Sequence, residues 1–233
     1  MADTLNGMDL ELDGKIVLVV GGTGLIGSAV VRCLRAEGAI AISAARSAST
    51  DLQLDASDEH SVQAGIQQVM DMHGRIDGLV HAAAPSARTL DPAGNSDPAR
   101  VMEAVQGKAL GFLRMANAVL PHMRAAGSGR IVGVSGQNAL VTGNIAGSVR
   151  NGALITIAKH LADEHVGTGI GINTVSPGIV SEHPATSVAP GGFGDTTPTQ
   201  VAEVIAFLLS PRAAGLSGES MAIGHRVRGV VSL

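Results

Sequence analysis

Aromatic residues are nearly absent from this sequence of 233 residues, which contains no tryptophan, no tyrosine and three phenylalanines. Proteins that bind single-stranded nucleic acid stack bases on aromatic side chains, and proteins that bind duplexes attract phosphates with basic surfaces. The formal net charge of this chain is −4, so it offers neither feature. We therefore do not expect nucleic acid as a partner.

Cysteine is represented by Cys33 alone, which excludes an internal disulfide. No group of His, Cys and Asp residues has metal-ligand spacing, and a Gly-x-Ser-x-Gly turn is absent, so neither a metal site nor serine hydrolysis is indicated. No apolar run reaches the length of about 20 residues that a membrane span needs. Residues 1–13 include acidic residues and lack the basic segment followed by an apolar segment that is typical of a signal peptide. These features favour a cytoplasmic protein that does not enter the membrane.

What the sequence does contain is a regular alternation of apolar segments. Six short segments are predicted as strands, at residues 15–20, 40–44, 78–82, 130–135, 170–176 and 220–223, and the first is a continuous apolar run typical of a strand buried on both faces. Helical patterns occupy the intervals, at residues 25–37, 61–72, 98–106, 108–124, 148–165 and 197–209. Strands that alternate with helices form a parallel sheet covered on both faces. We therefore predict a single α/β domain over residues 1–233, built as a Rossmann-like doubly wound parallel sheet.

The last helix has a clear start signal, with Thr197 as the cap, Pro198 at the first helical position and Gln200 placed to reach back. The stretch before it, residues 181–196, is rich in Gly, Pro, Ser and Thr. This composition favours either a mobile loop over a site or an ordinary surface connection.

A glycine-rich turn follows the first strand and opens the first helix. Backbone amides in such a turn can approach a pyrophosphate, and the helix N-terminus favours its negative charge. The residues expected to take part are Gly21, Thr23, Gly24, Leu25, Ile26 and Gly27. A lone glycine string is weak evidence, but the strand before it and the helix after it both agree. We predict a dinucleotide site.

The end of the second strand distinguishes the two nicotinamide cofactors. NAD binding calls for a carboxylate there, but no acid occurs between that strand and Asp51. Arg46 and Ser47 occupy the place instead and suit a 2′-phosphate. We therefore predict NADP(H) in preference to NAD(H).

Motifs along nearly the whole chain resemble the short-chain dehydrogenase/reductase family. They are Leu12–Lys15, the turn at 21–27, Asp55–Asp58, Leu79–Ala84, Gly129–Ser135, Ile172–Gly178 and Ser217–Glu219. The resemblance implies that Asp55 lies beside the adenine and that Ala82 and Ala83 line the cofactor in an altered Asn-Asn-Ala-Gly segment. It also implies that Pro177, Gly178 and Ile179 border the nicotinamide.

The resemblance breaks at the residues that carry out catalysis. The family uses a tyrosine as proton donor, a lysine one helical turn later, a serine and an asparagine, and this chain has no tyrosine. Matching the helix at 148–165 places Gly147 at the tyrosine position and Asn151 at the lysine position, from which Asn151 can bind the ribose. Ser135, or its neighbour Gly136, takes the serine position, and Lys108 takes the asparagine position.

Several polar residues near the expected site allow two interpretations. Lys108 is either a desolvated proton donor with a lowered pKa or a solvated residue at a helix start. His81 suggests a satisfied core histidine more than a catalytic base. Four further residues either orient a substrate or belong to loop surface, with the surface interpretation favoured for each, namely Gln137, Asn138, Asn144 and Arg150.

We rank three functions from these features. The first is an atypical NADP(H)-dependent oxidoreductase acting on a small-molecule carbonyl or conjugated double bond, with Ser135, Lys108 and Asn151 as candidate catalytic residues. The second is a non-redox enzyme such as an isomerase, dehydratase or cyclase, and the third is a non-catalytic NADP-binding scaffold. The resemblance further implies a homodimer or homotetramer formed through the helices at 108–124 and 148–165.

Overall fold

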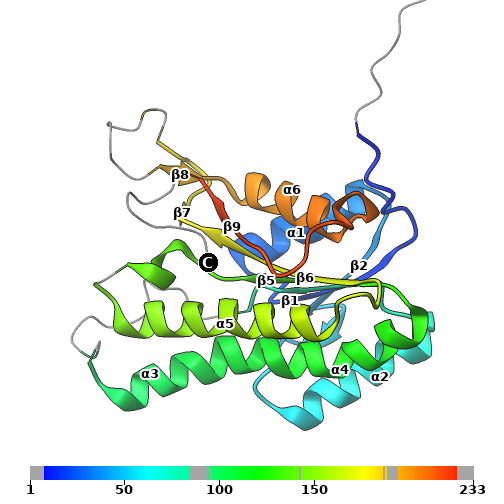
Figure 1. The fold of residues 1–233 in the computed structure, drawn as a ribbon, viewed down its shortest axis with the longest axis horizontal. Coiled ribbons are helices and arrows are strands. Elements are labelled where there is room, and N and C mark those ends of the chain that lie inside the picture. Colours follow the sequence, from blue (N-terminus) through cyan, green and yellow to red (C-terminus); the bar gives the residue numbers. More distant parts are fainter. Residues whose placement is uncertain are drawn as a thin grey trace, which may run out of the picture.

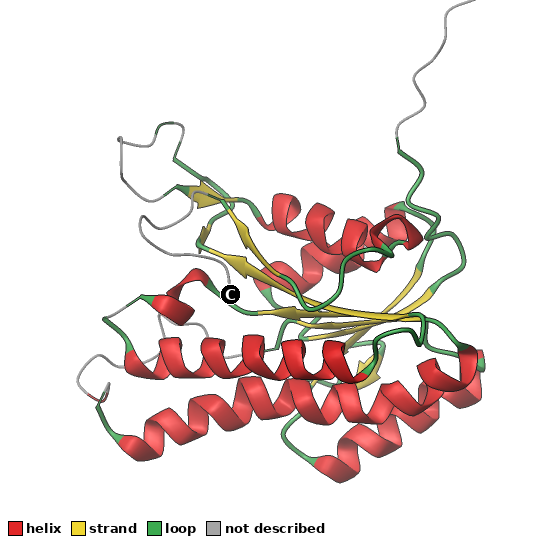
Figure 2. Ribbon diagram, viewed as in Figure 1, coloured by secondary structure: helices red, strands yellow, loops and turns green. Residues whose placement is uncertain are grey.

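A computed structural model of the chain contains one seven-stranded parallel sheet with helices on both faces (Figures 1 and 2). The structure describes residues 8–83, 94, 96–141, 143–185, 187 and 194–224. The strand order is β3-β2-β1-β4-β5-β6-β9. The strands are β1 (Ile16–Val20), β2 (Ile40–Ala45), β3 (Leu52–Gln53), β4 (Gly78–His81), β5 (Gly129–Val134), β6 (Ile170–Pro177) and β9 (Ser220–Ile223). This confirms the predicted fold class, and the six predicted strands agree within one residue at each end.

Alternating side chains of the strands pack into two separate hydrophobic cores. Leu18 of β1 packs into the core beneath α2, α4 and α5, whereas Val17 and Val19 pack into the core beneath α1 and α6. Figure 1 shows these two helical layers on opposite sides of the sheet. The helices are α1 (Leu25–Ala36), α2 (Glu59–His73), α3 (Pro98–Val105), α4 (Gly111–Ala126), α5 (Ile145–Glu164) and α6 (Pro198–Leu209). A strand covered on both faces must be apolar throughout, which explains the continuous apolar run of β1.

The predicted break between the helices at 98–106 and 108–124 is wrong. A π-helical turn, η3 (Gln106–Leu110), joins α3 to α4 without interruption. A π turn adds a residue to the helical repeat. Lys108 and Ala109 lie within this turn, and both are buried.

Short elements at the rim complete the described part of the chain. Strands β7 (Ile179–Val180) and β8 (Asp195–Thr196) pair as a small separate sheet, so both ends of the expected loop are anchored. The centre of that loop, residues 186 and 188–193, lies outside the described residues. The predicted capping box is confirmed: Thr197 Oγ1 accepts from Gln200 N, and Gln200 Oε1 accepts from Thr197 N. None of the described helices combines the length and the apolar character needed to cross a membrane.

Candidate functional site

The glycine turn at the end of β1 is shaped so that side chains cannot be added to it. Gly21 has a φ of +83°, and a Cβ on it would lie 2.6 Å from the backbone nitrogen of Ala83. A Cβ on Gly27 would overlap the carbonyl oxygen of Gly21. The first contact brings the turn against Ala82 and Ala83 at the end of β4, and the second brings α1 against the turn. Both contacts need glycine.

The front of α1 is open. Gly24 is the N-cap residue, no side chain caps the helix, and the first turn carries no acid. Thr23, Gly24 and Leu25 are exposed. The first amides of a helix have no partner within it and point forward with the positive end of the helix dipole. This end of α1 can therefore accept a phosphate group, as the sequence predicts.

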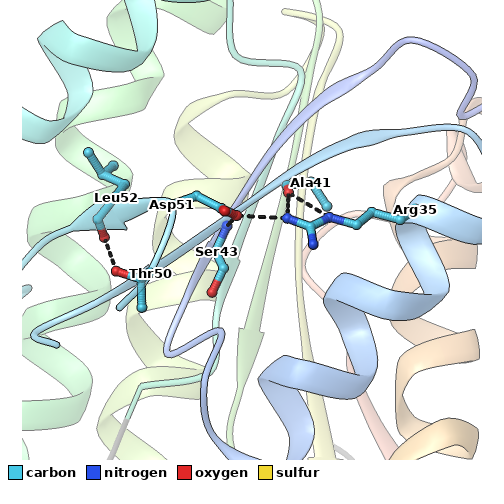
Figure 3. Close-up of polar contacts among 6 residues, drawn as sticks. All are labelled: Arg35, Ala41, Ser43, Thr50, Asp51 and Leu52. Carbon is cyan, nitrogen blue, oxygen red and sulfur yellow. Dashed lines mark hydrogen bonds and ion pairs between the residues drawn. The ribbon is translucent and has the colours of Figure 1, made fainter. Parts of the chain in front are cut away.

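The nearest acid to the end of β2 is already engaged. The Asp51 carboxylate accepts from Arg35 Nη2 at 2.7 Å and from the Ser43 backbone nitrogen at 2.9 Å (Figure 3). Arg35 also donates to the Ala41 carbonyl at 2.9 Å. Asp51 is thus held against the middle of β2, while Arg46 and Ser47, which follow β2, are exposed.

Asp55 lies within electrostatic reach of Arg46. Its carboxylate accepts from the Ser57 hydroxyl at 2.7 Å and from the Ser57 backbone nitrogen at 2.9 Å. These two hydrogen bonds lower the pKa of Asp55, and the charge of Arg46 lowers it further. The structure therefore groups Arg46 and Asp55, two predicted cofactor residues, at one end of the sheet.

The three candidate catalytic residues are joined by hydrogen bonds. Lys108 Nζ donates to the carbonyl oxygen of Ser135 at 3.1 Å, and Ser135 Oγ donates to the carbonyl oxygen of Asn151 at 3.1 Å. All three side chains are buried. The interpretation of Lys108 as a solvated residue at a helix start is therefore wrong, because the π turn places it inside the molecule.

Space for a side chain at position 147 is taken by a neighbour. A Cβ on Gly147 would lie 2.6 Å from Asn138 Nδ2. Asn138 Oδ1 in turn accepts from Asn151 Nδ2, and Asn144 Oδ1 caps α5 by accepting from Gly147 N at 2.7 Å. Asn151 Oδ1 is buried and has no hydrogen-bond partner in the described part of the chain. An amide pair thus occupies the positions where the family resemblance predicts tyrosine and lysine chemistry.

Burial dominates the electrostatics of this region. It lowers the pKa of Lys108 to about 7, and the positive charge of Arg150 on α5 contributes to the shift. Burial also lowers the pKa of His81 to about 3, with the charge of Lys108 adding to the effect and the Lys108 backbone opposing it. Loss of water around a cation disfavours its charged form, so both shifts follow from position.

His81 is buried, as expected, but it is not a satisfied core histidine. Neither ring nitrogen has a hydrogen-bond partner among the described residues. The ring makes an edge contact with Phe112 of α4, with centroids 6.0 Å apart. A histidine with a pKa of about 3 is neutral at physiological pH, so its two nitrogens remain one donor and one acceptor.

The turn after β6 is tied to the last strand. Gly178 N and Gln137 Nε2 both donate to the carbonyl oxygen of Ile223, at 3.2 and 3.0 Å. Gln137 and Arg150 are buried, so the surface interpretation is wrong for these two. Ile179, beside Pro177 and Gly178, is 47% exposed, which leaves an apolar side chain open at this rim.

Comparison with known proteins identifies the family. The model of a family described as enoyl-(acyl carrier protein) reductase matches residues 26–224. D-threitol dehydrogenase of Mycolicibacterium smegmatis is 30% identical over 244 residues, covering 92% of this chain and 93% of the relative. A 3-oxoacyl-[acyl-carrier-protein] reductase of Vibrio harveyi is 30% identical over 247 residues, covering 91% and 96%.

Solved structures share the fold. A ribose-5-phosphate isomerase structure from Brucella melitensis superposes with a TM-score of 0.82 at 25% identity, covering 93% of each chain. An aldohexose dehydrogenase from Thermoplasma acidophilum superposes with a TM-score of 0.77 at 20% identity, covering 91% of this chain and 93% of that one.

Proposed function

Since the chain belongs to the short-chain dehydrogenase/reductase family, we propose that it is an NADP(H)-dependent oxidoreductase that reduces a small molecule. The observation that carries the proposal is the open turn at 21–27 in front of α1. Related proteins that match almost the whole chain are a dehydrogenase and a reductase. A bound nicotinamide cofactor would supply the hydride, and the protein has to position the substrate and provide a proton.

The preference for NADP(H) rests on charge at the end of β2. Arg46 and Ser47 are exposed there, and a guanidinium pairs well with a 2′-phosphate. Arg35 and the Ser43 backbone nitrogen both donate to Asp51 Oδ2, which holds this carboxylate beside the middle of β2. A phosphate placed here would meet the Arg46 guanidinium, while Asp51 is held by Arg35.

Other residues would complete the cofactor site. Ala82 and Ala83 would line it beside the glycine turn, and Asp55 would contact the adenine. Asn151 would accept a hydrogen bond from a ribose hydroxyl at its buried Oδ1, which has no partner among the described residues. The turn of Pro177, Gly178 and exposed Ile179 would border the nicotinamide.

The absence of tyrosine restricts the reaction. Reduction of a conjugated double bond or an activated carbonyl asks less of a protein acid than reduction of a simple ketone. Lys108, with a pKa of about 7 and a hydrogen bond to Ser135, is the proton source that we propose. A donor with this pKa exchanges its proton readily at neutral pH.

The two alternative functions have less support. A non-redox enzyme or a scaffold would also account for the missing tyrosine. However, the family model and the sequence relatives are reductases and dehydrogenases.

We predict that NADPH binds and delivers its hydride, and that Arg46 selects it over NADH. Cofactor at 100 times its dissociation constant adds about 2.7 kcal/mol. That addition raises the melting temperature by roughly 2–4 °C per kcal/mol. NADPH should give a larger shift than NADH in the wild type, and Arg46→Ala should remove the difference because the 2′-phosphate loses its cation. NADPH deuterated at C4 should leave deuterium in a reduced enone.

The control for the cofactor measurement is Arg32→Ala, which removes an exposed arginine of α1 outside the proposed site. It should keep the preference for NADPH. Equal shifts with both cofactors in the wild type would disprove the NADP(H) preference. Binding of NADPH without deuterium in any product from a panel of enones and ketones would move the assignment to a non-redox enzyme.

A further inference from the structure

Three asparagine side chains gather where the turn after β5 meets the start of α5, and we call them the asparagine cluster. Asn138 lies on this turn, η4 (Gln137–Leu140). Asn144 is the N-cap residue of α5, and Asn151 lies within that helix. A Cβ on Gly147 would lie 2.6 Å from Asn138 Nδ2 and 3.2 Å from Asn144 Oδ1, so both carboxamides contact the first turn of α5.

Each side chain of the asparagine cluster uses only one end of its carboxamide. Asn138 Oδ1 accepts from Asn151 Nδ2, and Asn144 Oδ1 accepts from Gly147 N at 2.7 Å. Across the residues that the structure describes, Asn138 Nδ2 and Asn144 Nδ2 have no hydrogen-bond partner, and neither has the buried Asn151 Oδ1. Because a carboxamide nitrogen carries two N–H donors, the cluster leaves donors on Asn138 and Asn144 for a ligand.

These donors are accessible and held in place. Asn138 and Asn144 are half-buried, whereas Asn151 is 3% exposed. Ser148 Oγ donates to the carbonyl oxygen of Val141 at 2.7 Å, which joins the end of the turn to α5. Side chains that are already fixed lose less conformational freedom when a ligand binds, so the cluster is preorganised for a partner.

The asparagine cluster adjoins the residues assigned to the reaction. A Cβ on Gly136 would lie 2.8 Å from Asn151 Nδ2 and 3.1 Å from Asn138 Oδ1. Gly136 directly follows Ser135, whose Oγ donates to the Asn151 carbonyl and whose carbonyl accepts from Lys108 Nζ. A ligand on Asn138 would thus be close to Ser135 and to the amide that we assign to the cofactor ribose.

We propose that Asn138 and Asn144 bind a hydroxyl oxygen of the substrate through their open N–H donors, so that the substrate is a hydroxylated carbonyl compound. The three carboxamides carry no charge, and a neutral oxygen is a suitable acceptor for amide donors. A hydroxyl group next to the reacting carbonyl also withdraws electrons from it, which suits a site without tyrosine. Calling the ligand a substrate rests on the proposed oxidoreductase function, whereas hydroxyl binding by the cluster is independent of it.

Hydroxyacetone and butanone test the proposal, because they share a methyl ketone and differ by a hydroxyl in place of a methyl group. Both are titrated in the presence of NADP⁺, which has no hydride to transfer. Binding is followed in proton–nitrogen NMR spectra, which show the side-chain NH₂ groups of asparagine. Hydroxyacetone should bind about tenfold more tightly than butanone, because only its hydroxyl accepts the additional hydrogen bond. It should also shift the NH₂ signals of Asn138 and Asn144.

The variants Asn138→Asp and Asn144→Asp separate ligand binding from a structural role. Each keeps the oxygen that already accepts a hydrogen bond, from Asn151 or from the Gly147 backbone, and removes the N–H donors. Each should weaken hydroxyacetone binding about tenfold and leave butanone binding unchanged. Each also assigns one NH₂ signal by its loss. Asn117→Asp, which makes the same change at an exposed asparagine of α4, is the matched control and should behave as the wild type.

Three results would overturn the hydroxyl site. They are equal affinity for the two ketones in the wild type, unmoved NH₂ signals of Asn138 and Asn144 with hydroxyacetone, or a preference for hydroxyacetone that persists in both aspartate variants. The first two are measured on the wild type, so a variant that fails to fold leaves the test intact. With NADPH in place of NADP⁺, preferred binding of hydroxyacetone without hydride transfer would contradict the reductase proposal alone. Reduction of both ketones with equal affinity and equal kcat/KM would contradict the hydroxyl site alone.

Discussion

At the scale of single residues, the burial of Lys108 destabilises the folded protein. Burial lowers the pKa of its side chain from the ordinary value of 10.5 to about 7 in the folded protein. Between these two values the unfolded chain holds the proton and the folded protein has released it. The free energy of unfolding therefore rises with pH from about 7 to 10.5, and the destabilisation is complete below pH 7.

We predict that Lys108→Met is more stable than the wild type at pH 6. Each unit of pKa shift corresponds to about 1.4 kcal/mol, and loss of the hydrogen bond to Ser135 offsets part of the gain. The free energy of unfolding should rise by on the order of 2–4 kcal/mol at pH 6, and the gain should shrink as pH approaches 10. Urea denaturation at several pH values measures it.

The corresponding control is Lys159→Met, which removes an exposed lysine of α5 and its ion pair with Asp163, worth less than about 1 kcal/mol. Its effect should not depend on pH in the same way. Parallel stability curves for the wild type and Lys108→Met across this pH range would show that Lys108 is not desolvated.

At the scale of secondary structure, apolar patterns were enough to predict the sheet. Strand β1 is buried along its whole length and appears in sequence as a continuous apolar run, whereas β6 is equally buried but contains Asn173, Thr174 and Ser176. All twelve predicted strands and helices occur within three residues of their predicted ends. Strand β3, with two residues, is too short to leave a pattern.

The candidate site was harder to predict because its geometry depends on a local irregularity. A regular helical repeat does not reveal the π turn at 106–110, which turns Lys108 inward. The burial of Gln137 and Arg150 likewise depends on contacts between distant segments, such as the bond from Gln137 to Ile223, 86 residues away. The glycine turn, by contrast, is a local feature and was predicted residue by residue.

The junction between the glycine turn and α1 gives a prediction at this scale. In Gly27→Ala the new methyl group would overlap the Gly21 carbonyl, so the turn and the helix must separate. We expect a destabilisation of about 1–3 kcal/mol, typical of overpacking, and loss of the melting-temperature shift with NADPH. Thermal denaturation with and without NADPH measures both effects.

A second glycine provides the reference for this measurement. Around Gly215 nothing lies within 4 Å of an added Cβ, so Gly215→Ala should keep both the stability and the NADPH shift. A Gly27→Ala variant that is as stable as the wild type and binds NADPH equally well would refute the packing argument.

At the scale of the whole molecule, two cores share one sheet. Leu18 belongs to one core and Val17 and Val19 to the other, yet all three stand on β1. Loss of either helical layer would expose one face of the same strands, so we expect the two cores to unfold together. The glycine turn at 21–27 and Ser135, the hydrogen-bond partner of Lys108, both directly follow strands of this sheet.

The helical layer beneath the sheet also exposes apolar side chains. Ile145 and Val149 lie one turn apart on α5, Met102 lies on α3, and all three are at least 44% exposed. Figure 1 shows α3 beside α5 in this layer. Exposed apolar residues gathered on neighbouring helices are typical of a protein–protein interface. The predicted partner is a second copy of the chain.

We predict that the chain forms a homodimer or homotetramer through α4 and α5. The substitution Val149→Glu on α5 should dissociate this assembly. A closed interface repeats the same contact on both subunits, so one substitution introduces two charges into the apolar centre. Sedimentation velocity at micromolar concentration should give a smaller species for Val149→Glu than for the wild type. Val166→Glu, placed just beyond the end of α5 at a residue that is 78% exposed, is the matched control and should leave the assembly intact. A wild type that sediments as a monomer would show that this apolar face has another occupant.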